Sequence, residues 1–359
     1  MQISGGYGGS IGGEVSIVGG AGNETRGGNV VVLSGSGTLG PSGGVSIASA
    51  DASSGETSGD VTLSTGLSSG GASGSMLLAT SASEEGKGGS VSISVGAGDA
   101  ELGGDVRLAA GGTIHATGAG GRVEITSGTG MTGGDVTIAG GSGTSTIGGN
   151  VQIWSGGGSN ATSGDITISS SDSGSLQTSG QISLFTGVST GGDSGRIELV
   201  TSDAKTTAGS IDLLVGSGGS RRGGDVLVRS GDSNHTSGVG GRIVVVGGTG
   251  TTVGGDVEIS GGVDSAEVGG GVRVASGSGS TASSGSVSIG SADAGTNQTS
   301  GSVTVSSGIS LDGASGYVSI VTSNATGGAG GSITVSVGSG NAGTGGDVHV
   351  GGGNSTTSL

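Results

Sequence analysis

One short motif recurs along the whole chain and constrains its fold more than any other feature. It consists of a glycine pair, one polar residue, and then an apolar, a polar and an apolar residue, as in Gly133-Gly134-Asp135-Val136-Thr137-Ile138. We call the first apolar residue of each copy the marker. Markers stand at positions 15, 30, 45, 61, 76, 91, 106, 123, 136, 151, 166, 182, 197, 211, 226, 243, 257, 272, 287, 303, 318, 333 and 348. With Met1-Gln2-Ile3 as a degenerate first copy, the chain contains 24 repeats of about 15 residues.

A fixed period of this kind is typical of a solenoid, in which each repeat buries its apolar side against its neighbours. In an extended segment, the marker and the residue two positions later point to the same face. The sequence therefore predicts an all-β fold, a parallel β-solenoid (β-helix) of about 24 coils of ~15 residues. The pairs Val136 and Ile138, Val151 and Ile153, and Ile166 and Ile168 would stack inward. The same alternation leaves open a set of antiparallel strands in a sheet or barrel.

A longer period lies above the first. The spacings from 45 to 61, from 166 to 182 and from 287 to 303 are each sixteen residues, and markers eight repeats apart differ by about 121. This predicts three super-repeats of eight coils, at 1–120, 121–240 and 241–359, within one continuous solenoid. Neither end carries a recognisable cap, which favours end-to-end polymerisation or continuation within a longer chain.

Composition narrows the functional classes. The 94 Gly residues are also typical of flexible linkers, but a linker has no reason to keep the apolar pairs in register through more than twenty copies. The absence of Cys excludes disulfides and thiolate metal sites. A net charge of -16 argues against nucleic acid and anionic membrane surfaces as partners. No apolar run approaches the length of a membrane span.

Charged residues beside the markers predict side-chain ladders between successive coils. An arginine is flanked by two aspartates in three successive repeats, and again one super-repeat later: Asp105, Arg122 and Asp135, then Asp225, Arg242 and Asp256. Exposed ion pairs contribute only about 0 to 1 kcal/mol each. We therefore expect these ladders to fix the order of the coils more than their stability.

Six Asn-x-Ser/Thr sequons lie six to ten residues after a marker, in the Gly, Ser and Thr-rich half of a repeat. Their asparagines are Asn23, Asn160, Asn234, Asn297, Asn324 and Asn354. Sequons in exposed loops are acceptors for N-linked glycans in secreted proteins. This placement predicts glycosylation and an extracellular or cell-surface location. The structural alternative is that asparagine is simply common in turns.

No pattern in the chain indicates catalysis, a cofactor or a metal site. His115 and His235 occupy equivalent loop positions one super-repeat apart, too far apart to share a metal ion. No Ser-His-Asp set or paired carboxylates stand in a distinct insertion, and Gly-x-Gly-x-x-Gly matches precede no predicted helix. We therefore expect a structural protein, not an enzyme. An ice-binding or an adhesin or fibre-stalk solenoid is the alternative function.

The Gly-Gly-Asp-Val-Thr-Ile repeats and the Gly/Ser loops resemble the repeats of extracellular Gly/Ser-rich glycoprotein fibres of algae and other microbial eukaryotes, including mastigoneme-like filaments. The resemblance extends over the whole chain, but it carries no functional residue. It implies a building block of a glycosylated extracellular filament or surface appendage. The partner would be the chain itself, joined end to end or continued in a longer repetitive chain, together with covalent glycans.

Overall fold

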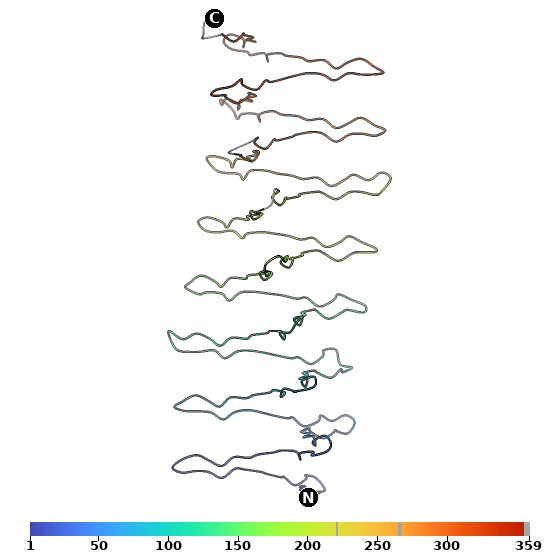
Figure 1. The fold of residues 1–359 in the computed structure, drawn as a ribbon, viewed down its shortest axis with the longest axis vertical. Helices are drawn as coiled ribbons and strands as arrows, with labels where there is room; N and C mark the ends of the chain where they lie inside the picture. The colour runs from blue at the N-terminus through green and yellow to red at the C-terminus, as the bar shows by residue number, and fades with distance from the viewer. Residues whose placement is uncertain (220–221, 265–267, 355–359) are drawn as a thin grey trace. The chain divides into compact units, whose positions relative to one another are not determined.

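The chain is built from extended legs joined by bends and turns. The computed structural model describes residues 1–219, 222–264 and 268–354, and within these ranges there is neither a helix nor a strand. The chain divides into two units, Met1–Ile182 and Ser183–Leu359. In each unit the ribbon runs out and back repeatedly without a single arrow or coil (Figure 1). The predicted all-β parallel β-solenoid is therefore wrong, and so is the alternative of antiparallel strands, because the chain is mostly coil.

The location of the backbone hydrogen bonds explains this difference. A solenoid requires bonds between the triplets of successive coils. In the part of the chain that the structure describes, the recurring bond instead closes a loop within one repeat. The N–H of the glycine two residues before a marker donates to the C=O five residues after the preceding marker, as in Gly134 to Gly128 at 2.9 Å and Gly149 to Gly141 at 2.8 Å. The glycine-rich half of each repeat thus folds back on its own backbone.

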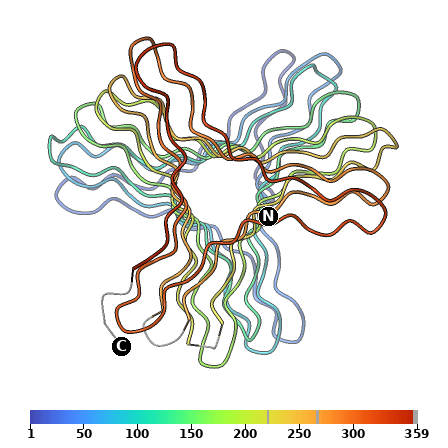
Figure 2. The same cartoon turned by 90° about the horizontal axis from the view of Figure 1, so that it is seen from above.

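In some loops the two legs approach so closely that one of them needs glycine. Glycine stands two residues before all 23 markers, where it faces the residue four positions after the preceding marker. A Cβ added at Gly104 would lie 2.8 Å from Val95 Cγ1, and one at Gly134 would lie 3.4 Å from Ser127 Cβ. Figure 2 shows these loops from above as narrow pairs of legs. A side chain at Gly104 would push the legs apart, whereas at Gly59 and Gly195 a Cβ would make ordinary contacts of 3.7 and 3.6 Å.

The loop-closing bonds follow the eight-repeat period of the sequence. Three successive closed loops span 6–13, 20–28 and 35–43, four more span 111–121, 128–134, 141–149 and 156–164, and a further four span 231–241, 248–255, 262–270 and 277–285. Four loops separate each run from the next, and among the described residues they carry no such bond. The residue four positions after each marker follows the same period. It is Gly, Ser, Ser, Thr, Thr and Val for the six markers from 15 to 91, and the same series recurs for the six markers from 136 to 211. The division into domains at 120 and 240 stays a prediction.

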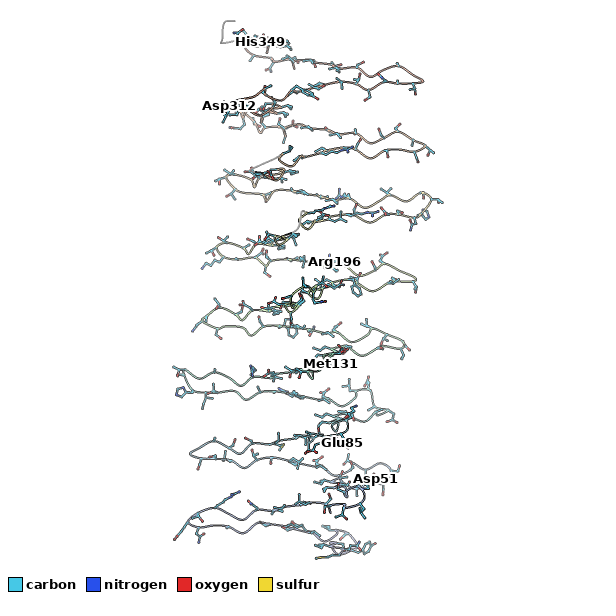
Figure 3. All side chains as sticks on the ribbon, viewed as in Figure 1. Asp51, Glu85, Met131, Arg196, Asp312 and His349 are labelled. Atoms are coloured by element: carbon cyan, nitrogen blue, oxygen red, sulfur yellow. The ribbon has the colours of Figure 1, made fainter. Side chains whose placement is uncertain are left out.

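No described side chain is buried, so the predicted inward stack is also wrong. Val136 and Ile138 are 52% and 69% exposed, and Val151 and Ile153 are 51% and 63% exposed. The accessible surface is 35,422 Å², whereas a compact protein of 32.6 kDa would expose only about 12,000 Å² and its unfolded chain about 47,000 Å². Side chains stand out from the ribbon along its length (Figure 3). The repeats therefore do not form a hydrophobic core.

Candidate functional site

The sequon asparagines lie in the loops and are exposed. All six asparagines are exposed, as are the hydroxyl residues Thr25, Thr162, Thr236, Thr299 and Thr326 of five sequons. The sixth sequon, Asn354-Ser355-Thr356, extends beyond the described residues. Asn23 and Asn160 lie in bends, and Asn234 directly precedes a turn that starts at His235. The carboxamide nitrogens are thus placed where a glycan would meet solvent and not a packed interior.

Asn297 has the most defined geometry of the six. The N–H of Gln298 donates to the C=O of Gly295 at 3.1 Å, which makes Asn297 the third residue of a four-residue turn. Its φ is 62°, in the left-handed region. A turn with this conformation at its third residue favours glycine or asparagine there. Asn297 therefore suits its backbone position whether or not a glycan is attached.

The same turn recurs in the two preceding blocks of eight repeats. Glu56 donates to Ser53 at 3.1 Å with Gly55 at φ 88°, and Gln177 donates to Gly174 at 3.3 Å with Leu176 at φ 65°. Positions 55, 176 and 297 are thus equivalent, and they carry Gly, Leu and Asn. Sequence analysis missed this turn, although the alignment of equivalent loops at Gly55 and Asn297 contained the signal.

Four arginines form ion pairs with carboxylates two or three residues further along the chain. Arg122 Nη2 lies 2.6 Å from Glu124 Oε2, and Arg196 Nη2 lies 2.7 Å from Glu198 Oε2. Both arginine side chains are about four-fifths exposed, at 80% and 81%. Among the predicted ladder residues, Asp225 accepts from Arg222 at 2.8 Å. The predicted flanking of Arg122 by Asp105 and Asp135, and of Arg242 by Asp225 and Asp256, stays a prediction.

His115 and His235 organise two equivalent turns. The Nδ1 atom of His115 accepts the backbone N–H of Thr117 at 3.3 Å, and Nδ1 of His235 accepts that of Ser237 at 3.2 Å. The C=O of each histidine accepts the N–H of Gly118 or Gly238, at 3.0 and 2.9 Å. Each ring nitrogen also lies near the hydroxyl of the same residue, at 3.2 Å from Thr117 Oγ1 and 3.1 Å from Ser237 Oγ. The two histidines thus act as local turn residues.

In a second recurrent turn, a glycine amide donates a hydrogen bond to a serine hydroxyl three residues earlier. Gly71 donates to Ser68 Oγ, Gly192 to Ser189 Oγ and Gly313 to Ser310 Oγ, each at 3.1 Å, and Gly86 donates to Ser83 Oγ at 3.0 Å. Each serine lies seven residues after a marker. Hydroxyl-to-backbone bonds of this kind stabilise short turns. Sequence analysis missed this Ser-x-x-Gly turn, although the spacing is regular.

The described ranges contain neither a cavity nor a cluster of metal-ligating side chains. No group of three or more His, Asp or Glu residues is arranged there to hold a metal ion. The same residues contain no helix long and apolar enough to cross a membrane. What the described loops offer chemically are exposed amides, hydroxyls and carboxylates.

Comparisons with known proteins give no relationship: no family model matches the chain, and no curated protein or solved structure matches it.

Proposed function

We propose that the chain is a repetitive structural segment of an extracellular, glycosylated filament or surface appendage. The observation that carries this proposal is the exposure of the sequon asparagines in the loops, where Asn23 and Asn160 lie in bends and Asn297 lies in a turn. Repetition of one loop type along the chain suits a structural protein that forms a long assembly with a large exposed surface. The net charge of -16 and the glycans together would hinder side-by-side aggregation of such filaments.

Glycosidase treatment of the native protein tests the proposal. We expect intact mass to fall on treatment, and peptide mapping to find each occupied asparagine converted to aspartate. Asn29, Asn150 and Asn341 lie outside sequons and serve as internal controls that should stay asparagine. Exchange of Thr299 for Val should abolish modification at Asn297 alone, because the sequon requires the hydroxyl residue.

Electron microscopy of the native material provides the second measurement. We expect elongated assemblies that contain the glycosylated chain. Native protein without any sugar mass would contradict the glycan part of the proposal. Isolated single chains under native conditions would contradict the filament part.

A further inference from the structure

Four loops share one turn but differ in the residue that precedes its last glycine. The turns are Ser68–Gly71, Ser83–Gly86, Ser189–Gly192 and Ser310–Gly313. In each, the final amide N–H donates to the serine Oγ. The residue before this amide is Gly70, Glu85, Gly191 or Asp312. Asp312-Gly313 therefore places an aspartate directly before a glycine amide, in a turn that the chain also presents with glycine or glutamate at that position.

Asp312-Gly313 is the one Asp-Gly step in the sequence, and no Asn-Gly step occurs. Twelve of the other sixteen aspartates lie directly before a marker, a leucine or an alanine, and the remaining four lie before serine, so a Cβ crowds the following nitrogen in every case. Gly313 has no Cβ. Both residues of the step are exposed, and Asp312 is labelled on its loop in Figure 3. Water therefore reaches this step, and no Cβ on the following residue crowds the Gly313 nitrogen.

We propose that Asp312-Gly313 is a site of spontaneous succinimide formation and isoaspartate accumulation. The Gly313 nitrogen loses its proton and attacks the side-chain carboxyl carbon of Asp312. A bond forms between nitrogen and that carbon, and the carboxyl OH leaves as water. The product is a five-membered imide, and no electrons are gained or lost.

Water then opens the ring and restores the original mass. Attack at the side-chain carbonyl regenerates aspartate. Attack at the former main-chain carbonyl of Asp312 routes the backbone through the side chain and leaves a free α-carboxylate. The second product is isoaspartate, which lengthens the main chain of this turn by one methylene group.

Glu85-Gly86 provides the matched control within the chain. It has the same turn and the same serine acceptor, at 3.0 Å instead of 3.1 Å. Its carboxyl carbon is one methylene further from the backbone, so the same attack would close a six-membered ring, which is much slower. Figure 3 labels both side chains on their loops. The proposal therefore predicts modification at Asp312 and none at Glu85.

Ser310 acts as a restraint on the reaction. The Gly313 N–H that must ionise is held by Ser310 Oγ. Removing this acceptor with Ser310→Ala should free the amide for the rotation that the attack requires. We expect isoaspartate to accumulate faster in Ser310→Ala than in the unaltered chain.

The test is prolonged incubation of the full chain at neutral pH and 37 °C, followed by peptide mapping that separates aspartyl from isoaspartyl peptides. A synthetic peptide that spans Ser310–Ser315 establishes that the assay detects the reaction. We expect isoaspartate at Asp312, none at Glu85, and its loss in Asp312→Glu. Conversion of the peptide without conversion of the chain would overturn the proposal, as would equal modification at other aspartates.

Discussion

Leu176 occupies a backbone position that disfavours it, and replacing it with glycine should strengthen its turn. Its φ of 65° lies in the left-handed region, where the equivalent residues are Gly55 and Asn297. Its side chain is fully exposed, at 101%, so it loses no packing when removed. The effect of Leu176→Gly therefore comes from the backbone alone.

The magnitude follows from two opposing terms. An L-residue in the left-handed conformation costs about 1 to 2 kcal/mol. Glycine loses more conformational freedom on ordering, which costs about 0.5 to 1 kcal/mol. The central values of the two ranges leave a net gain of about 0.75 kcal/mol, which corresponds to roughly a three- to fourfold shift of the turn toward its closed form.

Amide hydrogen exchange at Gln177 measures this shift directly. The Gln177 N–H donates to Gly174 at 3.3 Å and closes the turn. We expect its exchange to slow by about three- to fourfold in Leu176→Gly. The amides of Glu56 and Gln298 close the two equivalent turns and serve as internal references, because the substitution should leave them unchanged.

Leu176→Ala is the control that isolates the cause. It removes the same exposed side chain but keeps a Cβ, so the backbone penalty remains. We expect no slowing of Gln177 exchange in this variant. If alanine protects the amide as well as glycine does, the positive φ is not what weakens this turn, and our reasoning fails.

Two further predictions concern the loops and the ion pairs. A Cβ at Gly140 would overlap the C=O of Gly149, whereas one at Gly141 meets nothing within 4 Å. Gly140→Ala should therefore break the bond from Gly149 to Gly141 and cost about 0.5 to 1.5 kcal/mol locally, read from Gly149 amide exchange. Gly141→Ala should leave that exchange unchanged, and equal effects of the two variants would refute the close approach. Arg122→Glu should replace the ion pair with Glu124 by two carboxylates that repel each other, and should speed amide exchange in this segment more at low salt than at high salt; a salt-independent change would argue against an ionic origin.

Periodicity predicted the wrong secondary structure because it records which residues alternate, not which groups form hydrogen bonds. Val136 and Ile138 satisfy the pattern of a strand. A strand also needs a neighbouring backbone, and the nearby glycines bond within their own loops instead, as from Gly149 to Gly141. The linker-like composition, with 94 Gly, was the better guide to a mostly coil chain.

The positions of the turns could be predicted only in part from the sequence. The Gly, Ser and Thr-rich half of each repeat was expected to form the loop, and the bends and turns lie there. The equivalence of His115 and His235 was visible from spacing alone. The positive φ of Leu176 was not, because leucine gives no signal for that conformation. Only alignment of one block of eight repeats with the next would have placed it opposite Gly55 and Asn297.

The alternation of closed and unclosed loops has a mechanical consequence. Each closed loop shortens the chain, and releasing one of nine residues, such as 141–149, would add about 25 Å of contour. Each release costs only about 0.5 to 1.5 kcal/mol, the net value of one hydrogen bond. A pulled chain would therefore lengthen in stages. Runs of unclosed loops would yield first. The runs of three or four closed loops would then open one weak hydrogen bond at a time, absorbing work, and would close again when the tension is removed.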